Sequence, residues 1–358
     1  MSDRSAIEWT DATWTPIRAR NRLTGKIGWH CEHKSLGCLN CYAEGLNHRL
    51  GTGLPFRPWY RKDIEIFLDE KMLTAPLRWR RPRMIFVCSM TDLFADFVAD
   101  EMIDHVFAVM ALASQHTFQV LTKRLARMRD YSARWFERLA TGRVVVDHPA
   151  GRAAFSELVD WSCLPAILPN VWFGASTEDQ KRADERIPDL LATSAAVRFV
   201  SAEPLLAPIN YTRIAHENGR PDHYYNALAG YVIDGNQSQT EKLDWIIVGG
   251  ESGRKARPMH PAWARDMRDQ CAAAGVPYFF KQWGEWGNDM PIRSAEPGKF
   301  ALWHDGGLGW SYHDGSLRHF DRFGATARMT RVGKKSAGRL LDGVEHNAMP
   351  QLKTRAAA

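Results

Sequence analysis

The chain has 358 residues, of which 45% are hydrophobic and 25% charged, and its 47 lysines and arginines against 41 aspartates and glutamates give a net charge of +6. This composition is typical of a folded globular protein and excludes disordered and collagen-like classes. The longest apolar runs, such as Ile246-Ile247-Val248, fall far short of the roughly 20 residues that a membrane-spanning helix needs. Because Met1-Ser2-Asp3-Arg4 contains no apolar signal core, we expect a cytoplasmic protein.

Short apolar runs recur along the chain, and each ends in polar residues. They lie at 83–89, 117–122, 170–176, 197–201, 244–250 and 277–281. Runs that are apolar throughout are typical of strands buried on both faces, as in a parallel sheet. Helical spacing of apolar residues falls between them, at 100–114, 178–192 and 261–274. This alternation predicts an α/β fold whose parallel strands form a full or partial (β/α) barrel.

Some segments interrupt the alternation. Residues 131–168 are expected to hold extra helices, and the polar segment 211–241 is expected to be an insertion or a lid. The tail that follows Trp286 is rich in glycine, histidine and aspartate, which favours a short β-rich appendage. We therefore predict a barrel domain over 1–286, with insertions at 131–168 and 211–241, and a small C-terminal appendage over 287–358.

Polar residues follow every predicted strand, where barrel enzymes place their chemistry. The candidates at these strand ends are Ser89, Asp92, Lys123, Arg124, Ser176, Glu178, Glu203, Gly249, Gly250, Glu251, Lys281 and Gln282. Some of them, such as Ser176, could instead serve only as helix caps. Charged residues beside buried strands are costly unless they are paired or functional, which favours a function for Lys123-Arg124, Glu203 and Glu251.

The turn Gly249-Gly250-Glu251-Ser252-Gly253 is rich in glycine, which lets a ligand approach the backbone closely. It has neither the GxGxxG spacing of a dinucleotide site nor the lysine of a P-loop. The sequence therefore gives no support to a Rossmann or P-loop nucleotide site at this turn.

The strongest chemical signal is the C-x6-C-x2-C spacing of Cys31, Cys38 and Cys41. The other cysteines, Cys88, Cys163 and Cys271, are scattered and are typical of core thiols. Disulfides are not expected in a cytoplasmic protein, and clustered cysteines in a reducing compartment indicate a metal.

Three interpretations of the cysteine segment compete. In the first, three thiolates hold a [4Fe–4S] cluster and leave one iron open to a small-molecule chelate. In the second, the three thiolates and either His30 or His33 hold zinc, as in a nucleic-acid-binding zinc knuckle. In the third, the thiols are buried and bind nothing. Spacing alone leaves iron–sulfur and zinc open.

Aromatic and basic residues are interleaved in several places, for example in Trp59-Tyr60-Arg61-Lys62 and Arg78-Trp79-Arg80-Arg81. Such residues can stack on bases and bind a phosphate backbone, although they can equally be core tryptophans beside a charged surface. The mild positive charge permits a DNA, RNA or nucleotide partner without requiring one.

Several blocks of sequence together resemble a known family. They are 7–16, 37–44 ending in Cys41-Tyr42-Ala43-Glu44, 86–94, 116–124, 248–253 and 279–284. In their order and in their residues these blocks are similar to the three-Cys-motif family of phage-associated and bacterial proteins, a domain of unknown function. That family is similar in turn to the radical S-adenosylmethionine superfamily, including its spore photoproduct lyase branch, whose common spacing is C-x3-C-x2-C.

The resemblance implies a [4Fe–4S] cluster on Cys31, Cys38 and Cys41, with S-adenosylmethionine chelating the open iron. An external one-electron reductant would then cleave the sulfonium and release a 5′-deoxyadenosyl radical. The superfamily usually has an aromatic residue beside the last cysteine, and here Tyr42 follows Cys41 rather than preceding it.

Further roles are assigned by chemical type. Lys123 or Arg124 suits the cofactor carboxylate, and Glu203 or Glu251 suits its ammonium group. The candidates for the ribose hydroxyls and the neighbouring backbone contacts are Ser89, Asp92, Ser176, Glu178, Gly249 and Gly250. The candidate catalytic residues are Cys88, as a hydrogen-atom donor, together with Lys281 and Gln282.

Together these features predict a radical enzyme, a lyase or transferase, that acts on a nucleic acid or nucleotide in lesion repair or base modification. The competing prediction is a zinc-dependent nucleic-acid-binding protein without catalysis. No membrane partner is expected, and the sequence does not indicate an oligomeric state.

Overall fold

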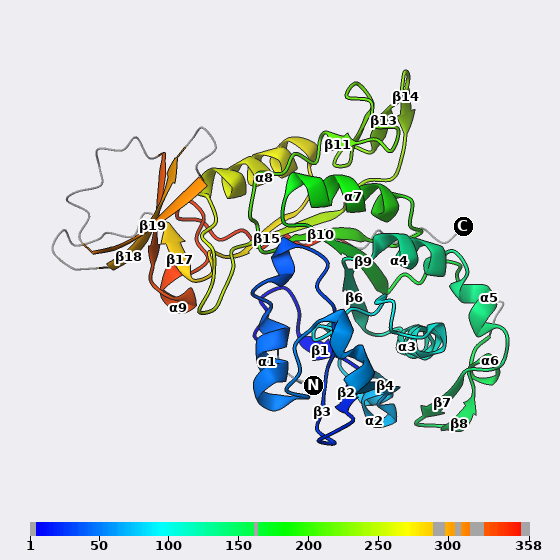
Figure 1. Ribbon diagram of the computed structural model, residues 1–358. Coiled ribbons are helices and arrows are strands. Elements are labelled where there is room, and N and C mark those ends of the chain that lie inside the picture. Colours follow the sequence, from blue (N-terminus) through cyan, green and yellow to red (C-terminus); the bar gives the residue numbers. More distant parts are fainter. Residues whose placement is uncertain (1–4, 161–163, 289–297, 305–308, 316–325, 352–358) are drawn as a thin grey trace. The chain divides into compact units, whose positions relative to one another are not determined.

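The computed structural model describes residues 5–160, 164–288, 298–304, 309–315 and 326–351. The chain forms two units, drawn from blue to red along the sequence in Figure 1. The first comprises Met1–Ser176 and Glu185–Phe199, and the second comprises Thr177–Asp184 and Val200–Ala358. Cys163, which the sequence suggested as a core thiol, lies outside the described residues.

Parallel strands form the main sheet. Within the described residues seven strands are hydrogen-bonded in the order β1-β5-β6-β9-β10-β15-β16 and form a half-barrel. Their bounds are β1 Ala12–Trp14, β5 Met84–Val87, β6 Thr117–Thr122, β9 Val171–Ser176, β10 Arg198–Ala202, β15 Trp245–Gly249 and β16 Tyr278–Gln282. The predicted α/β class is confirmed, and of the two barrel forms predicted it is the partial one.

Burial explains why these apolar runs form strands. Every residue of β9, β10 and β15 is buried, which is the pattern of a parallel sheet covered on both faces. Gly174 in β9 leaves room for the ring of Phe199, because a Cβ at this glycine would lie 2.4 Å from the ring. Close packing of the sheet therefore accounts for a glycine inside a strand.

Helices follow the strands as the sequence pattern predicted. The main ones are α3 Asp100–Leu112, α4 Leu125–Ser132, α7 Gln180–Leu191 and α8 Pro261–Ala274. The His260 side chain caps α8 by accepting from the Ala262 N–H at 3.1 Å, and the helix ends at Gly275, whose φ is 63°. Asp179 accepts from the Arg182 N–H at 2.8 Å, so the polar residue after β9 that acts as a helix cap is Asp179.

Smaller elements complete the first unit. The sheet β3-β2-β4 is antiparallel and precedes β5 in the chain. The bounds are β2 Ile17–Asn21, β3 Ile27–Gly28, η1 Leu36–Cys38, α1 Tyr42–Leu50, η2 Pro58–Asp63, β4 Ile64–Leu68, α2 Glu70–Leu73 and η3 Ala75–Arg78. The segment 131–168 contains α5 Trp135–Leu139, the hairpin of β7 Val145–His148 and β8 Gly151–Ala154, and α6 Phe155–Leu158.

The second unit contains two antiparallel sheets in addition to its parallel strands. The segment 211–241 forms the sheet β11-β12-β13-β14, with bounds β11 Ile214–Ala215, β12 Tyr224–Asn226, β13 Tyr231–Ile233 and β14 Gln237–Gln239. The C-terminal part forms the sheet β17-β20-β18-β19, with bounds β17 Trp286–Asn288, β18 Gly298–His304, β19 Gly309–Gly315 and β20 Ala327–Arg331, followed by α9 Lys334–Ala337. A lid role for 211–241 stays a prediction.

Candidate functional site

The three clustered cysteines lie on the segment that joins β3 to α1. Cys31 follows β3 in irregular backbone, Cys38 is the last residue of η1, and Cys41 is the N-cap residue of α1. The Cys41 N–H donates to the Cys38 carbonyl oxygen at 3.3 Å, so the C-x2-C pair forms a tight turn. All three residues are partly exposed. This segment is compact and accessible.

Three contacts fix this segment to the carboxyl ends of β5 and β6. The Thr91 hydroxyl donates to the His30 carbonyl oxygen at 2.5 Å. The Tyr42 hydroxyl donates to the Ser89 carbonyl oxygen at 2.6 Å, and thereby joins the start of α1 to the end of β5. The Arg124 guanidinium, at the end of β6, donates to a carbonyl oxygen of the cysteine segment at 3.2 Å. The cysteines are thus held at the edge where parallel sheets place chemistry.

A buried ion pair organises this edge. Asp92 and Arg124 are each 6% exposed, and Arg124 Nη1 donates to Asp92 Oδ2 at 2.8 Å. Asp92 also accepts from the Thr122 hydroxyl at 2.6 Å and from the Lys123 N–H at 3.1 Å. These two predicted cofactor ligands therefore bind each other, and both make further hydrogen bonds to the protein. Their geometry is that of residues that position the loop.

The electrostatics of the thiols show that the cysteines influence one another. The pKa of Cys31 is raised to about 12, mainly by burial, then by the negative charge of Asp92, and to a smaller extent by repulsion from Cys41 and Cys38. Burial also raises the pKa of Cys41, while the N–H groups of Glu44 and Ala43 at the start of α1 lower it. A thiolate at Cys31 would need a strong positive partner, such as a metal.

The histidines that could serve as a fourth zinc ligand have different surroundings. His33 Nε2 lies 2.8 Å from Glu44 Oε2 and 2.7 Å from Arg57 Nη1, so this nitrogen belongs to a charged network. His30 is 2% exposed, and burial lowers its pKa to about 4. Its Nε2 lies 3.7 Å from Glu32 Oε1. Across the described ranges, no three histidine, cysteine, aspartate or glutamate side chains are grouped as the ligands of one metal ion.

Lys123 and Ser176 form a second polar pair in the same unit. Lys123 Nζ, beyond the end of β6, donates to the Ser176 hydroxyl at the end of β9 at 2.7 Å. Lys123 is partly exposed, whereas Ser176 is buried. The positive charge of Lys123 also lowers the pKa of Cys41, against the larger effect of burial. A lysine that acts electrostatically on the cysteine segment is well placed to bind an anionic ligand there.

Cys88 lies at the end of β5 with an unusual backbone. Its φ is 54°, and it is 2% exposed. Its N–H donates to the Trp14 carbonyl oxygen at 2.7 Å, and its carbonyl oxygen accepts from Thr91 at 3.0 Å. Burial raises the pKa of the Cys88 thiol, which keeps its sulfur protonated. Cys88 therefore anchors the turn that carries Ser89 and Thr91.

Within the second unit, Glu203 and Lys281 form an ion pair. Lys281 Nζ lies 3.0 Å from Glu203 Oε1, and the Ser201 hydroxyl donates to Glu203 Oε2 at 3.0 Å. Gly249 leaves room for this carboxylate, because a Cβ at that position would lie 2.3 Å from Glu203 Oε1. The structure thus brings together three residues predicted from separate strand ends.

The turn after β15 is shaped by close packing and by a second ion pair. A Cβ at Gly250 would lie 1.9 Å from the Trp283 carbonyl oxygen. Glu251 is 6% exposed and accepts from Arg257 Nε at 2.9 Å and from Arg257 Nη2 at 2.6 Å. The glycines therefore admit neighbouring protein atoms, and Glu251 orders the loop that follows.

The two remaining candidates are buried in this second unit. Gln282 is 7% exposed and donates to the Ser252 hydroxyl at 3.0 Å, while its Oε1 is buried with no hydrogen-bond partner among the described residues. Glu178 has no exposed surface, and its carbonyl oxygen accepts from the Leu206 N–H at 2.8 Å. Gln282 thus keeps a spare acceptor beside the Gly-Gly-Glu turn.

The family comparison covers almost all of the fold described above. Residues 4–350 match the model of a family described as "Protein of unknown function (DUF5131)". The chain belongs to DUF5131. The match includes the cysteine segment, the whole half-barrel and both antiparallel sheets of the second unit, but the family description names no activity. Comparisons with curated proteins and with solved structures found no match.

Other properties of this DUF5131 member bear on where it can act. None of the helices in the described ranges is long and apolar enough to cross a membrane.

The sequence interpretation did not anticipate the anchoring role of Thr91 or the network of His33, Glu44 and Arg57. Thr91 lies in the Ser89-Met90-Thr91-Asp92 strand end, and that was its only signal.

Proposed function

We propose that this protein is a radical S-adenosylmethionine-type enzyme, with a [4Fe–4S] cluster held by Cys31, Cys38 and Cys41. The observation that carries the proposal is the anchoring of the cysteine segment to the carboxyl ends of β5 and β6 through Thr91 and Tyr42. In barrels of parallel strands this edge is where substrates and cofactors bind. The radical assignment itself comes from the resemblance, and the geometry supports it.

In residue type and number the donor set suits a cluster with one open iron, although the three sulfurs are not grouped as ligands of one metal ion in the described structure. Three cysteine sulfurs on one short segment supply three of the four ligands that a [4Fe–4S] cluster takes. When bound, the cluster and S-adenosylmethionine supply reductive cleavage: one electron from an external reductant breaks the carbon–sulfur bond and gives methionine and a 5′-deoxyadenosyl radical. The mutual repulsion of the three thiolates is relieved when positively charged irons bind them.

The protein's own residues would bind and orient the cofactor. Lys123, held by Ser176 at 2.7 Å, supplies a cation for the methionine carboxylate. Asp92 and Arg124 act as positioning residues, because their ion pair at 2.8 Å joins the turn after β5 to the end of β6. Tyr42 fixes the start of α1 beside the last cysteine.

Residues of the second unit are proposed for the substrate. Glu203 lies 3.0 Å from Lys281 Nζ and orients this lysine, and Gln282 offers a carbonyl oxygen that has no partner among the described residues. Glu251 is paired with Arg257, so its proposed role is to order the loop after β15. Cys88 remains the proposed hydrogen-atom donor, and a nucleic acid or nucleotide remains the proposed substrate of a repair or modification reaction.

The zinc alternative receives less support from the site. Zinc in structural sites takes four ligands at about 2.0–2.3 Å in a tetrahedron. His33 Nε2 already contacts Glu44 and Arg57. His30 lies buried beside Glu32 and is 2% exposed. His33 is therefore poorly placed as a fourth ligand, whereas His30 Nε2 has no hydrogen-bond partner among the described residues and stays the candidate for the zinc alternative.

Anaerobic turnover tests the proposal. The reconstituted protein is mixed with S-adenosylmethionine and dithionite, and 5′-deoxyadenosine is quantified by chromatography. We expect the product from the wild type and from the Cys271→Ala control, since Cys271 is buried in α8 and is not part of the C-x6-C-x2-C motif. Cys31→Ala, Cys38→Ala and Cys41→Ala should each reduce it to the level without enzyme. A fully loaded cluster that forms no 5′-deoxyadenosine would overturn the radical assignment and leave the cluster a structural role.

A further inference from the structure

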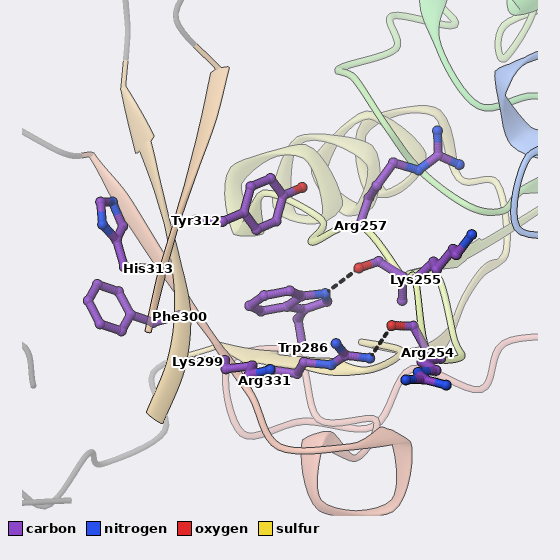
Figure 2. A pocket seen from close by; sticks show the side chains of 10 residues that line it. Arg254, Lys255, Arg257, Trp286, Lys299, Phe300, Tyr312, His313 and Arg331 are labelled. Carbon is purple, nitrogen blue, oxygen red and sulfur yellow. Dashed lines mark hydrogen bonds between the residues drawn. The ribbon is translucent and has the colours of Figure 1, made fainter. Parts of the chain in front are cut away.

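A basic pocket lies in the second unit, between the loop after β15 and the sheet β17-β20-β18-β19 (Figure 2). Its volume is about 330 Å³, which is at the small end of the range for ligand sites. The residues that line it are Arg254, Lys255, Ala256, Arg257, Trp286, Lys299, Phe300, Tyr312, His313 and Arg331. Neither the proposed cluster nor the proposed cofactor-binding residues use this pocket.

Strand pairing explains how distant residues meet on one face. Trp286 in β17 pairs with Arg331 in β20, and Tyr312 in β19 pairs with Ala301 in β18. Ala301 also pairs with Met329, two residues before Arg331. Because side chains two residues apart lie on the same face of a strand, Trp286, Tyr312 and Arg331 share a face. Figure 2 shows Trp286 and Tyr312 turned toward the loop at 254–257.

Two aromatic side chains of the pocket differ in exposure: Trp286 is buried and held by a hydrogen bond, whereas Tyr312 is exposed. Trp286 is 4% exposed, and its Nε1 donates to the Ala256 carbonyl oxygen at 2.8 Å. Tyr312 is 56% exposed, with its ring centre 5.9 Å from that of Trp286. An exposed aromatic ring next to basic side chains offers a face on which a planar group can stack. The Tyr312 ring is therefore a stacking surface with a rigid support behind it.

The charges around this stacking surface are positive. Five of the lining residues are arginine or lysine, and within the described part of the lining none carries a carboxylate. Arg331 Nη2 donates to the Arg254 carbonyl oxygen at 2.6 Å, and its guanidinium carbon lies 5.9 Å from the Trp286 ring centre. Arg257 is paired with Glu251, so the Glu251 carboxylate balances one of the five charges. The pocket as a whole favours an anion.

We propose that this pocket binds a nucleotide unit of single-stranded nucleic acid, with the base stacked on Tyr312 and the phosphates beside Arg254 and Lys255. An aromatic platform next to basic side chains is the combination with which proteins bind unpaired strands. A duplex keeps its bases stacked inside the helix and gives Tyr312 no face to contact. The choice of a nucleic-acid ligand rests on the proposed function, while the pocket itself does not depend on radical chemistry.

Binding by the full-length protein, without S-adenosylmethionine, tests this site. The probes are fluorescein-labelled 12-residue oligothymidine and oligouridine, followed by fluorescence anisotropy at several salt concentrations. We expect Tyr312→Ala to weaken binding by roughly 5- to 100-fold and Tyr312→Phe to bind within about twofold of the wild type. The paired change of Arg254→Ala and Lys255→Ala should lower the salt dependence by about 0.7 per lost phosphate contact.

Matched controls separate this site from general charge attraction. Arg220→Ala removes a similarly exposed arginine of the same unit, which lies 3.3 Å from Asp222, and should leave binding unchanged. Equal loss in Arg220→Ala and Arg254→Ala, unchanged binding in Tyr312→Ala, or equal competition by polyglutamate would each overturn the proposal. Tighter binding of one labelled strand identifies DNA or RNA as the ligand. Tyr312-dependent binding by a protein that forms no 5′-deoxyadenosine would leave this inference standing and remove the proposed function.

Discussion

At the scale of single residues, Asp92 connects more of the candidate site than any cysteine does. Its two carboxylate oxygens accept from Thr122, Lys123 and Arg124, and Arg124 reaches on to the cysteine segment. A carboxylate with 6% exposure is tolerated because its charge and its acceptor positions are matched by these donors. The position of the cysteine segment depends on this buried pair.

Asp92→Ala should therefore destabilise the protein strongly. The change leaves Arg124 buried without its counter-ion, which costs about 3–5 kcal/mol in comparable cases. Asp130→Ala is the matched control, because its pair with Arg129 is exposed and such pairs contribute about 0–1 kcal/mol. The free energy of unfolding, measured in urea, checks both. An equal, small effect of the two changes would show that the Asp92 pair does not hold the edge of the sheet together.

Sequence reasoning identified Lys123 and Arg124 as functional because charge beside a buried strand is costly, and it identified Asp92 by chemical type. It could not tell that Asp92 and Arg124 bind each other, since 31 residues separate them in the chain. Lys123 and Arg124 are neighbours, yet Lys123 contacts Ser176 and Arg124 contacts Asp92. The side chains of Lys123 and Arg124 point in different directions at the end of β6, and this difference separates their roles. The direction of a side chain cannot be predicted from residue type alone.

At the scale of elements, the turn after β15 shows how packing determines a motif. Its glycines were interpreted as access for a ligand. The structure gives them close protein neighbours: Glu203 Oε1 beside Gly249 and the Trp283 carbonyl oxygen beside Gly250. Close approach of backbone and side chains therefore requires glycine here before any ligand is considered.

Gly249→Ala should cost stability by overpacking. The added methyl group would lie 2.3 Å from Glu203 Oε1, and overpacked core positions lose about 1–3 kcal/mol. Gly45→Ala is the control, because this position of α1 has no atom within 4 Å of a built Cβ, and alanine in a helix gains about 0.5–1 kcal/mol over glycine. Thermal unfolding should move in opposite directions for the two variants. A stabilised Gly249→Ala would mean that Glu203 moves freely.

Helices and strands were predicted correctly where the pattern of apolar residues was long and its ends were marked by residues such as proline and glycine. Strand 117–122 and helix 261–274 agree with β6 and α8 to the residue, because proline starts that helix and glycine ends it. The strand β1 was missed, although it lies in a quoted sequence block. Its three residues, Ala12–Trp14, are too few to show alternation, and pairing with β5 defines it. The basic pocket was missed because its residues come from a loop and four strands.

At the scale of the whole molecule, the half-barrel followed from the order of strands and helices. Alternating buried strands and helices allow few arrangements other than a parallel sheet. The antiparallel sheet β11–β14 did not follow, because its short, half-polar strands resemble loops in sequence. The β-rich character of the part that contains β17–β20 was indicated by the composition of the tail after Trp286. The candidate site could be predicted in part. Its cysteines are recognised by their spacing in the sequence, whereas the contacts of Thr91 and Tyr42 that fix the cysteine segment depend on the fold.

The central claim is that Cys31, Cys38 and Cys41 together hold an iron–sulfur cluster, and metal content tests it most directly. Protein purified without oxygen is analysed for iron, sulfide and zinc, with Cys271→Ala as the control and the three single Cys→Ala variants alongside. The account predicts a brown wild type and control with about four irons per chain, and loss of iron in each variant of the segment. A colourless wild type with about one zinc and no iron would contradict it.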